Sequence, residues 1–241
     1  MINDKLTVFM HIPKTGGTTL SEILRQQYVF GEIFDHDSLG GIMKKADQLT
    51  IEEKRNIKAV AGHYFYGVHE QFKKSCTYFT MLREPIDRVL SSYYFLRNYK
   101  GYERVKNMSL REFVLNEPEA KNLQTLMICG QKLHPNLEKA KENLKTFKVV
   151  GITELFNESL FLIKKEYGWN NIHYDKRNIT KKRLRKQEVP ASVIDLIKQY
   201  NQLDLELYEF AKQLISQKLT TLTVDEQKQL QKYKQEQSRR T

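Results

Sequence analysis

Residues 13–19, which read Pro-Lys-Thr-Gly-Gly-Thr-Thr, combine side chains that suit the binding of a tetrahedral anion. Gly16 and Gly17 let the main chain approach a bulky anion, because no Cβ stands in the way. Lys14 adds a full positive charge. Hydroxyl donors come from Thr15, Thr18 and Thr19. An apolar run precedes this loop and a helix-like segment follows it, so the unpaired N–H groups of a helix start face the same anion. We therefore predict a phosphate- or sulfate-binding loop.

The order of residues separates this loop from that of nucleoside triphosphate-binding proteins. Their motif ends in Gly-Lys-Ser/Thr, where the lysine reaches the outer phosphates and the hydroxyl binds magnesium. Here Lys14 precedes both glycines, and no Gly-Lys pair occurs in the loop. A strand–glycine–helix turn is also compatible with an ordinary connection that binds nothing, so the loop alone does not decide the function.

A second segment, residues 76–97, favours the anion-binding interpretation. Residues 77–82 are apolar and β-prone, which is typical of a buried strand. Pro85 suits the first turn of a following helix, where its missing N–H costs nothing. Arg83 then falls at the carboxyl end of the strand, where open α/β sheets bind their ligands. Ser91 lies two helical turns further on, and a guanidinium and a hydroxyl together can hold one phosphate.

The two segments together resemble the cofactor motifs of sulfotransferases that use 3′-phosphoadenosine-5′-phosphosulfate (PAPS). Residues 13–19 are similar to the family's 5′-phosphosulfate loop. Residues 83–85 with Arg88 and residues 91–93 are similar to its 3′-phosphate motif. The likeness is to the carbohydrate branch that includes heparan sulfate 2-O-sulfotransferase. Further matches in family order are residues 61–63, 122–130, 150–154 and 207–211, so the likeness runs from about residue 6 to about residue 215.

This resemblance implies transfer of a sulfuryl group from PAPS to an acceptor hydroxyl, with no metal ion required. The residues that we expect to bind the co-substrate in the two motifs are Lys14, Thr15, Gly16, Gly17, Thr18, Thr19, Arg83 and Ser91. Lys14 is also expected to stabilise the leaving oxygen, since it lies in the loop that holds the phosphosulfate. The branch likeness favours a saccharide or glycolipid hydroxyl as the acceptor.

His63 is the predicted general base. It follows a predicted strand, so it emerges at the same sheet edge as Lys14 and Arg83. It also matches the Gly-His of the carbohydrate branch, whose histidine is assigned as the base. An unperturbed histidine titrates near about 6.5, which suits proton abstraction near neutrality. A lone histidine at a strand end is also compatible with a structural role, and His69 is the second candidate.

The other histidines suggest different roles. We expect His11 to pack or hydrogen-bond beside the loop, and His36 to lie in a polar segment within reach of an acceptor. His134 and His173 are expected at the surface. Ala61 stands where some members of the branch carry another histidine, which leaves the division of catalytic work between histidines open.

Residues 176–186 form the most basic stretch of the chain, Lys-Arg-Asn-Ile-Thr-Lys-Lys-Arg-Leu-Arg-Lys. One interpretation is a solvated basic loop. The other follows from the resemblance, because the family carries a basic, threonine-containing loop before its last helices. In that interpretation the segment closes over the 3′-phosphate and adenine, with Arg177, Thr180 and Lys181 as the contacts.

Alternating apolar and amphipathic stretches predict an α/β fold, a single domain with a central parallel sheet flanked by helices. The P-loop-like phosphosulfate-binding loop follows the first strand. Expected strands are residues 6–10, 58–62, 77–82 and 147–152. Expected helices are residues 18–27, 50–57, 86–98, 110–128 (with a break at Pro118), 136–145, 154–167, 190–199 and 203–218. The domain is expected over residues 1–218, followed at 219–241 by a polar tail that is either an exposed helix or frayed chain.

Composition leaves two other functions to weigh. The 241 residues carry 40 basic and 29 acidic side chains, a net charge of +11, which attracts polyanions of any kind. A non-enzymatic polyanion-binding protein explains this charge but neither phosphate motif. A small-molecule or nucleotide kinase explains a phosphate loop, but it calls for Gly-Lys-Ser/Thr and an acidic magnesium ligand.

The remaining sequence features carry no chemistry of their own. We expect Cys76 and Cys129 to be small core residues rather than a disulfide, and no Cys or His spacing indicates a metal site. The apolar stretches are shorter than the roughly 20 residues of a membrane span, and no leader pattern is present. These features favour a cytoplasmic, bacterial protein without a membrane span, and no motif indicates a specific nucleic-acid partner.

Overall fold

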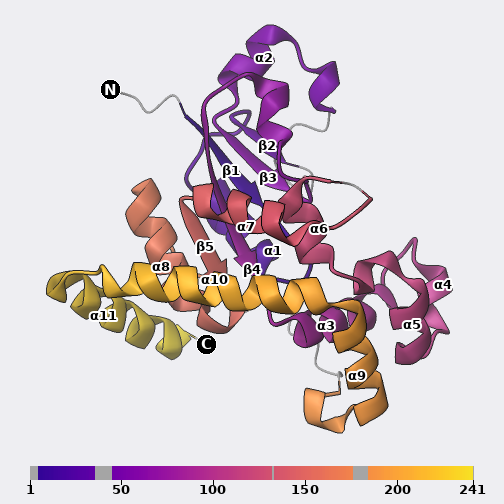
Figure 1. The fold of residues 1–241 in the computed structure, drawn as a ribbon. Helices are drawn as coiled ribbons and strands as arrows, with labels where there is room; N and C mark the ends of the chain where they lie inside the picture. The colour runs from indigo at the N-terminus through magenta and orange to yellow at the C-terminus, as the bar shows by residue number, and fades with distance from the viewer. Residues whose placement is uncertain (1–4, 36–44, 132, 176–183, 241) are drawn as a thin grey trace.

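The protein is an α/β domain in a computed structural model, which describes residues 5–35, 45–131, 133–175 and 184–240 (Figure 1). The described strands are β1 Leu6–Met10, β2 Ile33–Asp35, β3 Ala59–Gly62, β4 Cys76–Leu82 and β5 Val149–Ile152. They form one parallel sheet in the order β2-β3-β1-β4-β5. The strand that precedes the predicted anion loop is therefore at the centre of the sheet, and the predicted parallel α/β fold is confirmed.

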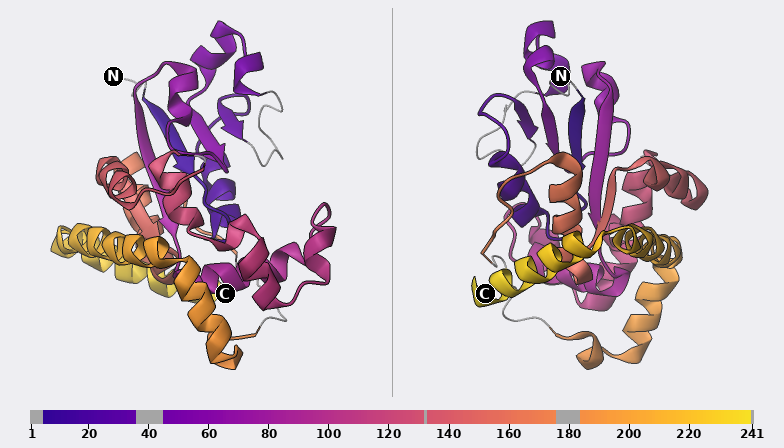
Figure 2. Two further views of the ribbon diagram at one scale, coloured as in Figure 1. Left: turned by 45° about the vertical axis from the view of Figure 1, so that its right-hand side comes forward. Right: turned by 90° about the vertical axis from the view of Figure 1, so that its left-hand side faces the viewer.

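The helices follow the expected alternation. They are α1 Gly17–Arg25, α2 Ile51–Asn56, α3 Pro85–Leu96, α4 Glu103–Lys106, α5 Leu110–Asn116, α6 Leu123–Cys129, α7 Leu137–Thr146, α8 Phe156–Tyr167, α9 Ala191–Tyr200, α10 Gln202–Thr220 and α11 Val224–Arg240. Helices α1 and α8 cover one face of the sheet, and α6, α7 and α10 cover the other (Figure 2). The domain is thus a three-layer sandwich with the sheet in the middle.

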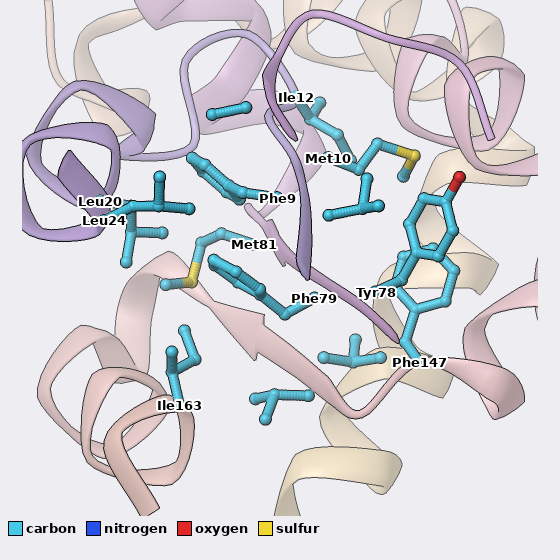
Figure 3. Packing of buried hydrophobic residues seen from close by; sticks show 14 of the residues in the cluster. Phe9, Met10, Ile12, Leu20, Leu24, Tyr78, Phe79, Met81, Phe147 and Ile163 are labelled. Atoms are coloured by element: carbon cyan, nitrogen blue, oxygen red, sulfur yellow. The ribbon is translucent and has the colours of Figure 1, made fainter. Parts of the chain in front are cut away.

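The core follows the strand alternation, since successive side chains point to opposite faces. Phe9 pairs in register with Phe79, and their rings stack at 4.9 Å on the side of α1 and α8. Figure 3 shows this pair beside Leu20 and Leu24, with Tyr78 and Phe147 on the opposite side of the sheet. All five strands are almost wholly buried, as expected for a parallel sheet covered on both faces.

A second apolar cluster lies beyond the carboxyl ends of the strands. It is built from α3, α4, α5 and α9, and it includes Ile86, Leu90, Phe113 and Ile197 (Figure 1). Pro85 occupies the first turn of α3, and the Glu84 carboxylate caps the helix by accepting a hydrogen bond from the Asp87 N–H at 2.8 Å. The Arg83 motif therefore links the sheet to this second cluster.

Several sequence expectations need adjustment. The helix expected over 110–128 is three pieces, because Pro118 starts a short 3-10 turn and Asn122 adopts a left-handed conformation. Strand β2 and helix α4 were not predicted, since three- and four-residue elements leave almost no periodic signal. Helix α11 covers most of the region expected as a polar tail. It buries Leu230 and Tyr233, and the Tyr233 hydroxyl donates to the Ile172 carbonyl at 3.1 Å.

Two further observations concern the cysteines and the length of the helices. Cys129 is buried, Cys76 is half-buried, and both thiols are free. Within the described ranges, we find no helix with the length and apolar character needed to cross a lipid bilayer.

Candidate active site

Three neighbouring strands bring the predicted site residues to one edge of the sheet. β3 and β4 flank β1, and Met10 pairs with Gly62 on one side and with Thr80 on the other. The anion loop leaves from the central strand, while His63 follows β3 and Arg83 follows β4. Because parallel strands end on the same side, the loop lies between the predicted base and the predicted phosphate-binding arginine.

The loop holds its shape through strained and buried residues. Lys14 has φ of +70°, unusual for a residue with a Cβ, and Gly16 has φ of +88°. Thr15 is fully buried, and its hydroxyl donates to the Ile12 carbonyl at 2.8 Å. The Thr15 hydroxyl is therefore committed to shaping the loop, which makes it a poor direct ligand. The carbonyl of Thr15 in turn accepts a hydrogen bond from the Thr153 hydroxyl at 3.0 Å.

Gly17 is required by a close approach. A Cβ at this position would lie 1.8 Å from Nε2 of His11, whose ring is itself buried and stacked on Phe9. At Gly16 a Cβ would meet the Phe156 ring at 2.9 Å. The two glycines thus fit different constraints, namely the positive φ of Gly16 and the closeness of a histidine ring to Gly17.

The start of α1 supplies main-chain donors to the loop. The first helical hydrogen bond runs from the Leu20 N–H to the Gly16 carbonyl at 3.4 Å, so the N–H groups of Gly17, Thr18 and Thr19 have no acceptor within the helix. Gly16 and Thr18 are exposed. An anion at this exposed helix start can accept hydrogen bonds from these groups and is favoured by the helix dipole.

Lys14 extends from the loop toward α3. Its ammonium lies 3.6 Å from the centroid of the Phe95 ring, in the geometry of a cation–π contact. Burial, and after it the neighbouring Arg83 charge, lower the pKa of Lys14 from 10.5 to about 8, although the Glu119 charge acts in the opposite direction. A partly desolvated ammonium next to a second cation is ready to accept an anion that neutralises both.

Arg83 is fixed at two points. Its main-chain N–H donates to Oε1 of Gln124 at 3.0 Å, and its carbonyl accepts from Nε2 of the same amide at 2.9 Å. Its guanidinium donates through Nη1 to the carbonyl of Lys14 at 3.1 Å. The last contact joins the two phosphate motifs in one site, although they are 69 residues apart in the chain.

Ser91 and Arg88 lie on α3 behind Arg83. Ser91 is buried, with 6% of its surface exposed, and Arg88 is completely buried. The Arg88 guanidinium donates through Nη2 to the Glu119 carbonyl at 2.9 Å, but Nε and Nη1 find no partner among the described residues. Burial lowers the pKa of Arg88, whereas the charges of Asp204 and Glu119 raise it. A buried guanidinium of this kind adds positive potential to the site without contacting solvent.

His63 is exposed at the end of β3, and its ring lies 4.4 Å from that of His11. His11 follows β1 directly, and its N–H donates to the Gly62 carbonyl at 3.0 Å. His11 is buried against Gly17 of the loop, and His63 is exposed to solvent. The two rings therefore form a continuous contact from the loop to the protein surface. Exposure leaves His63 accessible to an acceptor hydroxyl, as a base requires.

His69 is separated from this edge. Its Nδ1 lies 2.8 Å from the hydroxyl of Tyr78, near the beginning of β4, whereas Arg83 follows the end of that strand. The same ring packs edge-on against Tyr66. His69 is therefore engaged in the aromatic packing on the opposite side of the sheet from Phe9, which gives it a structural environment.

The remaining histidines are distributed as follows. His134 is exposed, and His173 is half-buried with Nε2 3.8 Å from Glu236 of α11. His36 lies outside the described residues, as do Arg177, Thr180 and Lys181, which were expected to contact the co-substrate. Beyond the latter three, Lys186 forms an ion pair at 3.0 Å with Glu84, next to Arg83.

The residues present suit a ligand that carries phosphate and sulfate groups. The start of α1 offers main-chain donors, and the Arg88 guanidinium retains buried nitrogens that have no partner among the described residues. Lys14 and Arg83 add two cations linked by a hydrogen bond. This donor set is entirely cationic or neutral, as expected for an anion site.

Sequence reasoning missed the residues that support Arg83 and Lys14. Gln124 lay inside a segment that resembled the family, but its side-chain role had no local signal. Phe95 and Asp204 lay inside the expected helices 86–98 and 203–218 and had no predicted role. Asp204 is completely buried and accepts hydrogen bonds from the Thr125 N–H and hydroxyl, both at 2.7 Å.

Several known proteins are similar to this chain. A heparan-sulfate 6-O-sulfotransferase 2 from Gallus gallus is 24% identical to this chain and aligns with 97% of it and 72% of its own length. The Homo sapiens enzyme of the same name is also 24% identical, but the chain spans only about half of it, 48%. The crystal structure of mouse sulfotransferase SULT7A1 complexed with PAP has a TM-score of 0.42 at 16% identity, covering 99% of this chain and 86% of that one.

The family to which these relatives belong is matched over most of the chain. The relatives are named for the 6-O position of heparan sulfate, whereas the motifs had suggested the branch that includes the 2-O enzyme. Both belong to carbohydrate sulfation, so the family expectation is confirmed. The model of the sulfotransferase family matches residues 1–211 of the 241. The chain therefore belongs to the sulfotransferase family.

Proposed function

We propose that this protein transfers the sulfuryl group of PAPS to a hydroxyl of a saccharide acceptor, with His63 as the general base. The observation that carries the proposal is the hydrogen bond from the Arg83 guanidinium to the Lys14 carbonyl at 3.1 Å. It unites a loop suited to a phosphosulfate with an arginine suited to a second phosphate. The 5′-phosphosulfate and the 3′-phosphate of PAPS are two such anionic groups on one ligand.

The residues of the loop bind and orient the reacting end. The donor supplies an activated sulfuryl group, which the acceptor hydroxyl attacks at sulfur while the bond to the bridging phosphate oxygen breaks. Main-chain N–H groups of Gly17, Thr18 and Thr19 can donate to the non-bridging oxygens. The Lys14 ammonium stabilises the negative charge that grows on the leaving oxygen, and this interaction strengthens in the transition state.

His63 takes the proton of the acceptor hydroxyl. It is exposed at the end of β3, beside the loop that follows β1, so an acceptor can approach it from solvent. His11 contacts the imidazole from the buried side and limits how the ring can turn. The base must be neutral before the reaction, so activity should fall at acidic pH, where an imidazole is protonated.

A polysaccharide is the acceptor that agrees best with the chain and its relatives. The relatives are named for heparan sulfate, which is a polyanion. The net charge of +11 favours association with such an acceptor through long-range attraction. A glycolipid with an acidic saccharide has the same chemistry and serves as a second acceptor to test.

A ligand-binding assay separates the proposed function from a kinase. Thermal shifts are measured with 3′,5′-adenosine bisphosphate and, separately, with ATP and Mg²⁺, because a ligand that binds only the folded state raises its stability. We expect stabilisation by the bisphosphate at concentrations where ATP has little effect. Preferential stabilisation by ATP would contradict the proposal.

An activity assay tests the acceptor. Labelled PAPS is incubated with desulfated heparan, with an acidic glycolipid and with no acceptor, and the products are analysed by mass spectrometry. We expect sulfation of the polysaccharide with loss of activity in the His63→Ala variant. Equal label release with and without acceptor would show hydrolysis instead of transfer.

A further inference from the structure

The main chain of Arg83 is held by a side chain from another part of the fold. β4 ends at Leu82, where its pairing with β5 also ends, so Arg83 is the first residue beyond the ladder. The Gln124 amide accepts from the Arg83 N–H at 3.0 Å and donates to the Arg83 carbonyl at 2.9 Å. One primary amide thus makes the two hydrogen bonds that a neighbouring strand would make.

This arrangement restricts the conformation of Arg83 strongly. A pair of hydrogen bonds from one rigid amide fixes both peptide groups of the residue, and with them the direction of its Cα–Cβ bond. Gln124 itself has no exposed surface, so its amide cannot exchange these partners for water. The direction in which the Arg83 side chain leaves the main chain is therefore set by Gln124.

Gln124 is in turn held by α10. Its N–H donates to Oδ2 of Asp204 at 3.1 Å, and the next residue, Thr125, donates to Oδ1 with both its N–H and its hydroxyl. Asp204 is completely buried. Its carboxylate compensates the start of α6 and fixes the helix that carries the glutamine.

A reciprocal contact locks the two helices together. The N–H of Asn122 donates to Oδ1 of Asn201 at 3.0 Å, and the N–H of Asp204 donates to Oδ1 of Asn122 at 3.1 Å. The support thus runs from α10 through α6 to the residue after β4. Each step is buried or partly buried, which makes the geometry stiff rather than adaptable.

We propose that Gln124 is a positioning residue for recognition of the 3′-phosphate, acting by holding the main chain of Arg83, with Asp204 fixing Gln124 from behind. The inference rests on the proposed function, since it assigns the 3′-phosphate to Arg83. Among the described residues, the hydrogen bonds of Gln124 go to Arg83 and Asp204 and not to the loop of residues 13–19. It should therefore govern affinity for ligands that carry a 3′-phosphate and leave affinity for the 5′ end unchanged.

The test compares two ligands that differ only in the 3′-phosphate, 3′,5′-adenosine bisphosphate and adenosine 5′-monophosphate. Calorimetry gives the dissociation constant of each. The constant for the monophosphate divided by that for the bisphosphate measures 3′-phosphate recognition, and this ratio falls when recognition is lost. The Gln124→Met variant keeps the length of the side chain and removes the amide. We expect it to weaken bisphosphate binding by about tenfold, and monophosphate binding by less than about twofold.

Gln237→Met is the matched control. Gln237 is a second buried glutamine, on α11, whose amide donates to the carbonyl of Tyr174. A loss of stability comparable to that of Gln124→Met is expected in thermal melts, but the ratio of the two dissociation constants should stay at the wild-type value. A purely structural role of Gln124 predicts instead that both variants behave alike.

A double-mutant cycle and a milder variant complete the experiment. In Arg83→Ala the added Gln124→Met change should not alter the ratio further, because residues that act through one contact are not additive. Asp204→Asn should lower the ratio by about two- to fivefold, and it serves if Gln124→Met does not fold.

The outcomes distinguish a failure of the proposed function from a failure of the role assigned to Gln124. A wild-type protein that binds both ligands equally would contradict the proposed function itself. A wild-type protein that prefers the bisphosphate, with that preference retained in Gln124→Met or, if that variant does not fold, in Asp204→Asn, would overturn the role of Gln124 alone.

Discussion

The loop of residues 13–19 and the Arg83 motif lie at the ends of neighbouring strands, yet they obtain their geometry from different sources. The loop is built largely by its own residues and the strand and helix that flank it. Gly16 supplies a left-handed turn, Thr15 bonds back to Ile12, and α1 begins at once. The Arg83 motif is built by residues more than 40 positions away in the chain, through the amide of Gln124 and the carboxylate of Asp204.

The difference affects how each half tolerates change. In the loop, the space next to the main chain is already filled, so a single added carbon produces a direct clash. In the Arg83 motif, the guanidinium is attached to a supported main chain, so removal of one support should alter affinity gradually. We therefore expect a substitution in the loop to abolish ligand binding abruptly. A substitution among the residues that support Arg83 should weaken binding by degrees.

Gly17→Ala should have the largest effect. The new Cβ would lie 1.8 Å from Nε2 of His11, whose ring is buried and stacked on Phe9 at 5.5 Å, so neither group can move easily. We expect the affinity for 3′,5′-adenosine bisphosphate to fall by more than about a hundredfold, measured by calorimetry. The double variant His11→Ala/Gly17→Ala removes the clashing ring and should recover part of the binding. Wild-type affinity in Gly17→Ala would mean that the loop adapts and is not closely packed.

His63→Ala tests the side of the loop that faces β3. Removal of a general base should lower turnover by about a hundredfold or more, while bisphosphate affinity and melting temperature stay near wild type. His69→Ala is the control. The His69 ring is hydrogen-bonded to the Tyr78 hydroxyl, so its removal should affect stability more than turnover. A stable and active His63→Ala enzyme would show that another group takes the proton.

The same contrast explains what could be predicted from the sequence. The parallel α/β fold and the loop with its lysine and glycines could be predicted, because strand, turn and helix signals follow one another within about 20 residues. The position of Arg83 at a strand end could be predicted for the same reason. Its support was not, since nothing around Gln124 or Asp204 indicates that α6 and α10 exchange hydrogen bonds across 80 residues.

Other features lacked a signal for different reasons. Strand β2 and helix α4 are too short to show periodicity. The packing of α11 depends on Leu230 and Tyr233, which stand among charged residues and bury only against a partner elsewhere in the chain. The Lys14–Phe95 contact joins a loop to the end of α3, and only the folded geometry places the two side chains together.

Arg83→Ala measures the Arg83 motif directly. Loss of a charged hydrogen-bond donor should weaken 3′,5′-adenosine bisphosphate binding by about tenfold to a hundredfold, with adenosine 5′-monophosphate much less affected. Arg97→Ala is a suitable control, because Arg97 is exposed at the opposite, C-terminal end of α3 and lies over Tyr93. Unchanged bisphosphate affinity in Arg83→Ala, measured by calorimetry, would remove this residue from the site.

The pH dependence of binding tests Lys14. Its pKa in the free protein is lowered from 10.5 to about 8, mainly by burial. A bound anion favours the charged form and raises the pKa of Lys14, so binding takes up a proton above pH 8. Between about pH 7 and pH 8 the phosphates are already dianionic, since their second pKa is about 6, so affinity for the bisphosphate should be level there. It should fall above about pH 8, by up to about tenfold per pH unit.

The control for this titration is Lys14→Arg. A guanidinium stays charged throughout the range, so the fall above about pH 8 should disappear in this variant even if its affinity is lower. A fall that persists in Lys14→Arg would assign the proton to another group.

Phe95→Leu should have the smallest effect, and it concerns the contact between Lys14 of the loop and a ring of α3. The ring holds the Lys14 ammonium 3.6 Å from its centroid, and a leucine keeps the apolar volume without the π face. A cation–π contact at a partly exposed site contributes about 0.5–1 kcal/mol, and an anion in the loop must compete with it for the ammonium. We therefore expect bisphosphate affinity to rise by about two- to fivefold in Phe95→Leu, measured by calorimetry below about pH 8, where Lys14 is charged. Phe30→Leu, at a phenylalanine that is 80% exposed in the connection between α1 and β2, should leave affinity unchanged. Weaker binding in Phe95→Leu would show the opposite arrangement, in which the ring holds Lys14 in place for the ligand.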